Sequence, residues 1–415
     1  MAKIFPFQPY RYTPAAGDIQ RLVTQPYDKI YPAMQQSYLA ASPYNLVRVI
    51  LGEKFPDDTE TNNVYTRAAG YFRQWIEGGQ LAQDAEPAFY AYFQEFSVPD
   101  TGERLVRKGF VGLGEVVEYA AGIVHRHEQT LSGPKKDRRE VLKHTHAHFG
   151  QIFMLYPDRE GAIDAVLDAV SAGAPDMEIR DEYDAVHRLW RIADPVLTAK
   201  IQGLMGDKKL LIADGHHRYE TSLGWRKDNP DMPGADKVMM TFVNMYSPGL
   251  KILATHRLVK DLEEFEADAF LKKAAVGFKV SHLASLEDLK ARWAEPHDGT
   301  MLIGCVLAGR DGIYLLECGK PSGLLDVRVL HETLLDKILG VSAEAVREEK
   351  FLKYARGADN AEAQVRAGAA QIGFLLEPTS VDEVADISFG GGVMPQKSTD
   401  FYPKLLTGVT IYKLG

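Results

Sequence analysis

Ionisable side chains and a glycine follow one another at Asp214-Gly215-His216-His217-Arg218, directly after a short apolar run. The run predicts a buried strand and the next residues predict a helix, with Gly215 allowing a tight turn and close approach of a ligand. Asp214 can cap that helix by accepting a bond from a first-turn N–H group. The other N–H groups, the imidazoles and the guanidinium would then form a site for an anion such as phosphate. The alternative is that Asp214 is only a cap and the histidines are satisfied polar groups.

A second group of charged residues lies at positions 125–138. An apolar strand leads to His127 and Glu128, a glycine-proline turn follows, and Lys135 and Arg138 stand at the start of a helix. A carboxylate beside cations can act as a base or hold Mg²⁺, while the two basic side chains can neutralise phosphate oxygens. The alternative is a solvated, charged loop.

A third segment, residues 390–404, is rich in glycine and hydroxyl groups, which is typical of a loop that closes over an anionic ligand. It contains Lys397, Ser398, Thr399 and Lys404. A loop that is packed by its aromatic residues is the alternative. The sequence has neither the Gly-x-x-x-x-Gly-Lys-Ser/Thr pattern nor a Gly-x-Gly-x-x-Gly turn opening a Rossmann unit.

Three alternate histidines, His144, His146 and His148, raise the question of a metal site. The first and last fall one turn apart on an expected helix. No acidic residue completes a His-Glu-x-x-His pattern and no cysteine is near. Surface histidines are therefore the favoured interpretation.

The composition is that of a globular protein, with 45% hydrophobic and 25% charged residues among 415. The net charge of −9 argues against a surface that binds long nucleic acid, because such binding requires a basic excess. Cys305 and Cys318 are expected to be reduced core thiols. The start of the chain has no secretory pattern, and no run of about eighteen apolar residues occurs. A cytoplasmic protein without a membrane span is expected.

The hydrophobic pattern alternates between helical and strand spacing, which predicts a mixed α/β protein. A chain of this length is too long to fold around a single hydrophobic core. A change of pattern predicts an N-terminal lobe, 1–250, with the Asp-Gly-His-His-Arg site, and a C-terminal lobe, 251–415. Helices are expected at 62–77, 137–149, 160–171, 216–227, 262–275, 285–294, 327–339 and 381–387. Strands are expected at 44–51, 88–96, 105–117, 151–156, 187–192, 209–213, 238–245, 300–307, 312–317, 371–376 and 406–414.

Motifs along the chain resemble those of the bacterial and archaeal family called domain of unknown function 1015. They run in order from residue 4 to about residue 410, so the resemblance covers essentially the whole chain. Asp400 stands where the family pattern has an aromatic residue. The matching segments are Pro6-Phe7 with Pro26-Tyr27-Asp28, His127-Glu128-x-Thr130 with Pro134-Lys135-x-Asp137-Arg138, residues 213–221, Thr255-His256-Arg257, and residues 394–399 with Phe401-Tyr402-Pro403-Lys404.

The Asp-Gly-His-His-Arg turn resembles that of the ParB and sulfiredoxin superfamily, whose members bind nucleotides there and include kinases of free L-serine. The resemblance implies a ParB/sulfiredoxin-like nucleotide-binding core with an additional α/β lobe, whose Lys-Ser-Thr loop closes over the site. It implies a phosphotransferase that uses ATP or ADP with Mg²⁺ and acts on a small hydroxyl-bearing metabolite such as free L-serine. The alternative is a ParB-like nucleotide-binding regulator or nucleotide hydrolase without a small-molecule acceptor. The net charge disfavours a nuclease, and the clustered ionisable residues disfavour a non-enzymatic scaffold.

The resemblance also implies roles for individual residues. The catalytic residues would be Asp214, as general base or Mg²⁺ partner, Glu128, as a second acid, and His217, which would hold the transferring phosphate. Phosphate or nucleotide contacts are expected from Gly215, His216, Arg218, Lys135, Arg138, Lys397, Ser398, Thr399 and Lys404. Substrate contacts are expected from His127, Glu220, Tyr27 and Asp28, and metal contacts from Asp214 and Glu128. Nucleic-acid and membrane partners are not expected, and a homodimer is compatible with the sequence.

Overall fold

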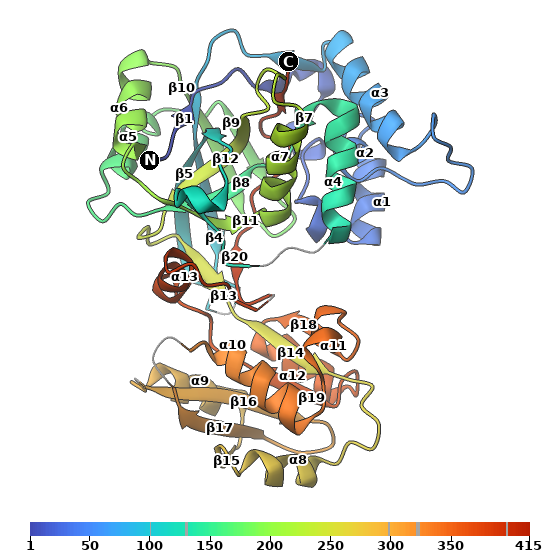
Figure 1. Ribbon diagram of the computed structural model, residues 1–415, viewed down its shortest axis with the longest axis vertical. Coiled ribbons are helices and arrows are strands. Elements are labelled where there is room, and N and C mark those ends of the chain that lie inside the picture. The colour runs from blue at the N-terminus through green and yellow to red at the C-terminus, as the bar shows by residue number, and fades with distance from the viewer. Residues whose placement is uncertain (100, 129–131, 298, 321–323, 396) are drawn as a thin grey trace. The chain divides into compact units, whose positions relative to one another are not determined.

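The computed structural model describes the chain except for residues 100, 129–131, 298, 321–323 and 396. The described chain is a mixed α/β protein, as the hydrophobic pattern predicts (Figure 1). It divides into two compact units. Unit 1 comprises residues 1–98, 103–250 and 403–415, and unit 2 comprises residues 99–102 and 251–402. The chain thus returns to unit 1 at Pro403 after it has formed unit 2.

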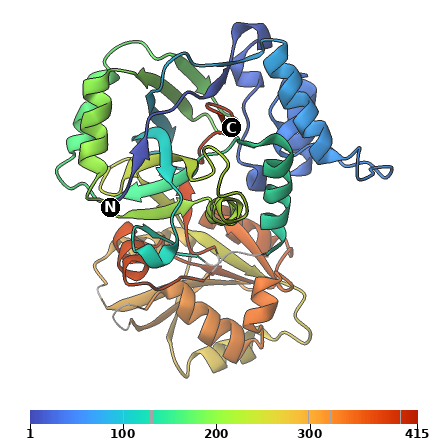
Figure 2. The ribbon, with the colours of Figure 1, turned by 45° about the horizontal axis from the view of Figure 1, so that its top comes forward.

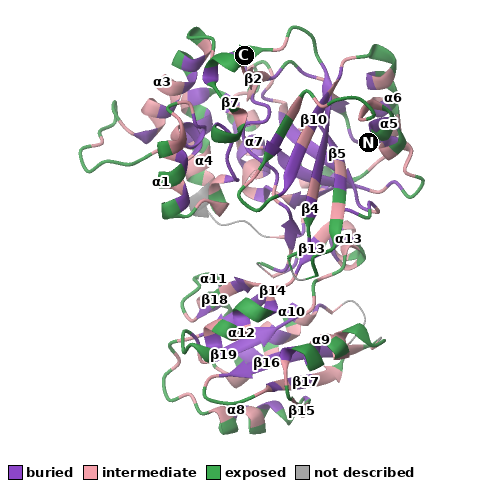
Figure 3. Cartoon of the chain, turned by 180° about the vertical axis from the view of Figure 1, so that it is seen from behind, coloured by how far each residue is buried: buried purple, intermediate pink, exposed green. Residues whose placement is uncertain are grey.

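Unit 1 is built on a nine-stranded mixed sheet in the order β6-β11-β8-β12-β5-β4-β10-β9, with β1 paired to β5. β11 runs parallel to β6, and β12 runs parallel to β8. The central strands are buried along most of their length (Figure 3). The strands are β1 (Ile4–Phe5), β4 (Phe89–Ser97), β5 (Arg104–Glu115), β6 (Val124–His125), β8 (Ile152–Tyr156), β9 (Met177–Arg180), β10 (Val186–Ile192), β11 (Leu210–Asp214) and β12 (Lys237–Asn244).

Three helices of unit 1 share one face of this sheet, namely α5 (Ala162–Val170), α6 (Pro195–Met205) and α7 (His216–Asp228). Their apolar side chains form one core with Ile152 and Met154, which are alternate residues of β8 and so point to the same side. The other helices are α1 (Pro32–Ala41), α2 (Val47–Ile50), α3 (Val64–Glu77) and α4 (Ser132–Thr145). Contacts join α7 to α4, α4 to α3 and α3 to α2, a row that can be followed in Figures 1 and 2.

Short elements complete unit 1. β2 (Tyr10–Tyr12) pairs with β3 (Leu81–Gln83), and β7 (Ala147–His148) pairs with β21 (Tyr412–Lys413). The second pairing ties the C-terminal segment to the strand that follows α4. Single 3-10 turns lie at Pro14–Ala16, Ile19–Arg21, Tyr27–Lys29 and Tyr119–Ala121.

Unit 2 contains a six-stranded antiparallel sheet in the order β15-β17-β16-β19-β14-β18 and a separate pair, β13 with β20. The hairpin expected at 300–307 and 312–317 is confirmed as β16 and β17. The strands are β13 (Lys251–Leu253), β14 (Thr255–Val259), β15 (Lys279–Leu283), β16 (Thr300–Leu307), β17 (Ile313–Gly319), β18 (Leu352–Arg356), β19 (Ile372–Leu375) and β20 (Asp400–Tyr402). The helices are α8 (Ala267–Ala274), α9 (Leu286–Ala294), α10 (Asp326–Val329), α11 (Ala343–Arg347), α12 (Ala358–Arg366) and α13 (Val381–Phe389).

Two predictions in the N-terminal half are wrong. The strand expected at 44–51 contains the helical turn α2, because the Asn45 side chain accepts a hydrogen bond from the Val47 N–H at 2.9 Å and starts a turn. The helix expected at 137–149 is α4, which starts earlier and ends at Thr145. The backbone then turns at His146, with φ of 49°, and enters β7. His144 and His148 therefore do not share a helix.

Two further predictions need correction. The helix expected at 327–339 is a short α-helix followed by a π-helix, Leu330–Ile338, in which the hydrogen bonds span one residue more than in an α-helix. The strand expected at 406–414 is reduced to β21, with isolated bridges at Thr407 and Ile411. Within the described residues we find no helix with the length and apolar character needed to cross a bilayer.

Candidate functional site

The turn between β11 and α7 confirms the expected strand, tight turn and helix. β11 is buried up to its last residue, Asp214, and α7 begins at His216. Gly215 between them has φ of 98°, and a Cβ atom built on it would lie 3.0 Å from Nη2 of Arg218. The expectation that Asp214 caps the helix is wrong. The N-cap residue is Gly215, which has no side chain that could accept the first-turn N–H groups.

This geometry predicts that Gly215→Ala destabilises unit 1 by about 1–2 kcal/mol, because the left-handed backbone is strained for any residue with a Cβ. Gly203→Ala is a matched control. Gly203 lies in α6, has no atoms within 4 Å of a built Cβ and has no left-handed φ, so its substitution should stabilise the helix slightly. Thermal denaturation of the two variants measures the difference. Equal midpoints would contradict a strained turn.

The Asp214 carboxylate lies among positive charges. Its oxygens are 3.8 Å from Nη2 of Arg218 and 3.5 Å from Nζ of Lys404. Burial would raise the pKa of this carboxyl, but the charges of Lys404, Arg218 and Lys29 outweigh it, so the pKa lies well below its ordinary value. Asp214 is therefore ionised at neutral pH. Lys404 comes from the segment in which the chain has returned to unit 1.

Arg218 is fixed by the backbone as well as by charge. Its guanidinium donates a hydrogen bond to the Gln151 carbonyl oxygen, at the start of β8. The Arg218 guanidinium and the Lys404 ammonium thus lie beside one carboxylate, next to the start of α7. Such a helix start attracts negatively charged oxygen atoms.

The pairing of β6 with β11 brings the second sequence cluster to the same turn. Nδ1 of His127 lies 2.8 Å from the Ile212 carbonyl oxygen, and the rings of His127 and His216 meet edge to face with centroids 4.6 Å apart. One ligand atom from each of His127, Glu128 and His216 lies within 4.8 Å of the others. Burial lowers the pKa of His127 to about 4 and that of His216 well below its ordinary value. Both imidazoles are therefore neutral at pH 7.

On the next turn of α7, Glu220 is paired with cations. Its carboxylate lies 2.9 Å from Nζ of Lys135 and 3.4 Å from Nη1 of Arg126. His217 is half-buried, and burial lowers its pKa, with Glu220 and Asp28 opposing the shift. Lys135 thus meets a carboxylate of α7 in this structure.

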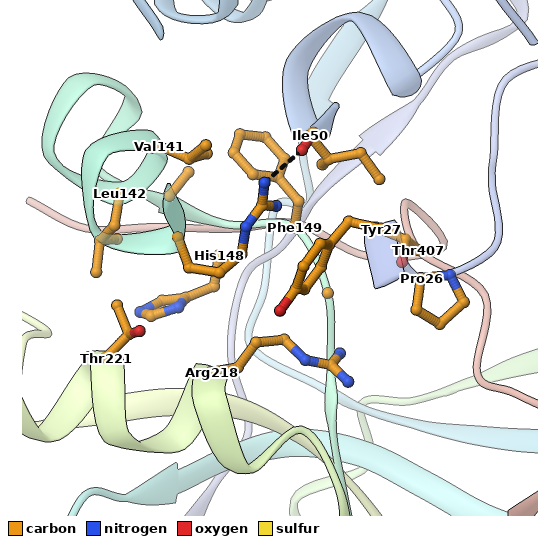
Figure 4. Close-up of a pocket in the computed structure, with 13 residues that line it drawn as sticks. Pro26, Tyr27, Ile50, Val141, Leu142, His148, Phe149, Arg218, Thr221 and Thr407 are labelled. Atoms are coloured by element: carbon orange, nitrogen blue, oxygen red, sulfur yellow. Dashed lines mark hydrogen bonds between the residues drawn. The ribbon is translucent and has the colours of Figure 1, made fainter. Parts of the chain in front are cut away.

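Tyr27 and Arg138 line a small cavity with Arg218 (Figure 4). The cavity has a volume of about 60 Å³, and Thr221 of α7 also contributes to its wall. The Arg138 guanidinium lies over the Tyr27 ring at 3.9 Å and donates to the Ile50 carbonyl oxygen at 2.7 Å. Burial, reinforced by neighbouring Asp28, raises the pKa of Tyr27 to about 12. Asp28 itself is exposed.

Three of the residues expected to contact phosphate belong to unit 2, namely Lys397, Ser398 and Thr399. The Lys397 carbonyl oxygen accepts a hydrogen bond from Arg257 at 2.9 Å, and the Ser398 carbonyl oxygen accepts one from Thr379 at 3.1 Å. These bonds hold the segment within unit 2.

The sequence interpretation overlooked Arg107. This residue of β5 is fully buried, and its guanidinium donates to Gln94 Oε1 and to the Pro403 carbonyl oxygen, one residue before Lys404. The sequence does contain a signal for this residue. Arg107 and Val111 are four positions apart on β5, so their side chains lie on the same face of the strand, and both are buried. An arginine on the buried side of a strand indicates a specific partner, here the returning segment.

Comparison with known proteins confirms the family. The chain matches the model described as "Protein of unknown function (DUF1015)" over residues 4–337, and it belongs to this family. No curated protein matches it.

Similar solved structures include a conserved hypothetical protein from Pyrococcus furiosus, 14% identical, with 70% of this chain and 92% of that chain covered and a TM-score of 0.37. A free serine kinase in complex with AMP is 15% identical, with coverage of 69% and 89% and a TM-score of 0.38. SbnI with a C-terminal truncation, from Staphylococcus aureus, is 9% identical, with coverage of 73% and 87% and a TM-score of 0.36.

Proposed function

We propose that unit 1 is a nucleotide-dependent phosphotransferase with a ParB/sulfiredoxin-like nucleotide-binding core. It transfers phosphate from ATP or ADP to a small hydroxyl-bearing metabolite, with free L-serine as the leading acceptor. The observation that carries the proposal is the turn between β11 and α7, where an ionised carboxylate lies among cations at the start of a helix. Phosphoryl transfer depends mainly on positioning and charge neutralisation, which such a turn can supply.

The phosphate is assigned to the first-turn N–H groups of α7 together with Arg218 and Lys404. Both side chains lie within 4 Å of Asp214, so a phosphate seated beside that carboxylate would be within their reach. Asp214 offers the carboxylate oxygens that Mg²⁺ prefers. When bound, Mg²⁺ supplies neutralisation of charge on the transferring phosphate.

The proton of the acceptor hydroxyl is assigned to His217. Asp214 is a weak base because surrounding cations lower its pKa, whereas the lowered pKa of His217 leaves its imidazole neutral and able to accept a proton at pH 7. In the transfer, the acceptor oxygen forms a bond to phosphorus as the bond from phosphorus to the nucleotide oxygen breaks. The hydroxyl proton passes to His217, and Asp214 positions the reacting groups.

The cavity beside Arg218 is assigned to the acceptor. At about 60 Å³ it is far smaller than a nucleotide site of several hundred Å³, so it suits a single small group. Arg138 and Arg218 on its wall would pair with a carboxylate, which an amino acid such as serine carries. Exposed Asp28, next to Tyr27, would face the ammonium group of the same molecule.

The test is to incubate the purified chain with Mg²⁺, ATP or ADP, and a panel of hydroxy amino acids, and to measure phosphorylated products by ³¹P nuclear magnetic resonance. The expected result is a phosphomonoester whose formation requires both nucleotide and acceptor. An acceptor without a carboxylate, such as ethanolamine, should react poorly because it lacks the partner for the two arginines. The proposal would be contradicted if the nucleotide were hydrolysed at a rate that no acceptor changes, or if no product formed. Either result would favour the regulator or hydrolase alternative.

A further inference from the structure

We propose that His127, Glu128 and His216 form a binding site for a first-row transition-metal ion such as Zn²⁺, Mn²⁺ or Fe²⁺. Their ligand atoms lie within 4.8 Å of one another, near enough for the three side chains to converge on one ion. Two residues come from the segment after β6, and His216 begins α7. The parallel pairing of β6 with β11 holds the two segments side by side.

The His127 ring has the orientation that is typical of a metal-bound histidine. Its Nδ1 lies 2.8 Å from the Ile212 carbonyl oxygen. A carbonyl oxygen only accepts hydrogen bonds, so Nδ1 carries the hydrogen and the lone pair lies on Nε2. A bond from the second ring nitrogen to a backbone carbonyl fixes the tautomer and ring orientation of many metal-bound histidines. The ring is only 1% exposed, so this orientation is held by the surrounding core.

His216 supplies an independent indication. It is 6% exposed, and its Nε2 atom is buried without a hydrogen-bond partner among the residues that the structure describes. A buried polar atom that is left without a partner is energetically costly, so the position of this atom indicates a missing partner. The ring meets the edge of His127, beside the Glu128 carboxylate. A cation bound between these groups would give Nε2 of His216 the partner that it lacks.

The donor set indicates the kind of ion. Two imidazoles and one carboxylate suit Zn²⁺, Fe²⁺ and related ions, whereas Mg²⁺ prefers oxygen donors and retains its water. Glu128 and His216 are therefore assigned to a transition metal. Asp214 would then be the carboxylate that binds a Mg²⁺ ion arriving with the nucleotide. The metal site does not depend on the phosphotransferase proposal, because it can bind its ion with no nucleotide present.

The experiment uses the full chain after treatment with a chelator. Co²⁺ serves as a spectroscopic probe, because its visible absorption reports coordination by protein ligands, and Zn²⁺ binding is measured by calorimetry. The variants are Glu128→Gln, His127→Ala and His216→Ala. His282→Ala is the control, since His282 is an exposed histidine of unit 2. Circular dichroism spectra verify that each variant is folded.

We expect one equivalent of Zn²⁺ to bind, Co²⁺ to give a visible spectrum that Zn²⁺ abolishes, and millimolar Mg²⁺ not to compete. Each ligand substitution should weaken Zn²⁺ binding by about 100-fold or more, since even removal of an outer-shell partner costs 10–100-fold. Glu128→Gln keeps the size of the side chain, so it tests the site even if a histidine variant fails to fold. Absent binding, equal binding by Glu128→Gln and the parent, or loss of binding in His282→Ala would overturn the inference.

Discussion

Replacing Asp214 with asparagine is expected to lower the rate of phosphoryl transfer by about 10²–10⁴-fold, the range typical of a positioned acid–base or metal-binding group. The amide has nearly the same shape but no charge. Arg218 and Lys404, at 3.8 and 3.5 Å, would lose the carboxylate that orients them. Initial rates with saturating nucleotide and serine measure the effect.

Asp236→Asn is the control, because this carboxylate is half-exposed, pairs with neighbouring Lys237 and lies outside the cavity and the Asp214 turn. It should leave the rate within about twofold of the parent, as expected for a surface substitution. An Asp214→Asn enzyme that retained full activity would remove Asp214 from the mechanism.

The charge of Asp214 also predicts a pH dependence of stability. The pKa of this carboxyl is lowered in the folded protein, so the unfolded chain binds the proton more readily. The contribution of Asp214 to stability is then complete above about pH 5 and is lost as pH falls below the unfolded value near 4. In the Asp214→Asn variant, the midpoint of thermal unfolding should therefore fall less steeply than in the parent as the pH is lowered through this range.

Replacing Arg107 with methionine is expected to cost about 3 kcal/mol of stability, because the hydrogen bonds of a buried charged group to two partners are lost. The guanidinium binds Gln94 and the Pro403 carbonyl oxygen, and Gln94 also donates to the Lys404 carbonyl oxygen at 2.9 Å. The loss should lower the midpoint of thermal unfolding by roughly 6–12 °C. It should also weaken nucleotide binding, because Lys404 would no longer be held near Asp214.

Arg104→Met provides the comparison on the same strand, β5. Its side chain is 75% exposed and pairs with Glu95 at the surface, so the substitution should change stability by less than about 0.5 kcal/mol. If Arg104→Met and Arg107→Met unfolded at the same temperature, the returning segment would not depend on Arg107.

The turn at Asp214 could be predicted because its signals are local. An apolar run, a glycine and a polar helix start follow each other within a dozen residues, and the structure confirms each as β11, a left-handed Gly215 and α7. The prediction that Asp214 caps α7 is also wrong for a local reason. The glycine itself occupies the N-cap position, which leaves Asp214 at the end of the strand.

The partners of the turn could not be derived in this way. Glu128 lies beside His216 because β6 pairs with β11, a contact between residues far apart in sequence. Lys404 lies beside Asp214 because the chain re-enters unit 1 at Pro403. Periodicity indicates which face of a strand is buried but not which strand lies next to it. Arg107 could have been found by its alternation phase, although its partner could not.

The most direct test of the central claim is a crystal structure of the full chain with ADP and Mg²⁺. We predict that a phosphate group lies against the first-turn N–H groups of α7, within hydrogen-bond distance of Arg218 and Lys404. A nucleotide bound elsewhere on the chain, with this turn unchanged and free of phosphate, would contradict the account.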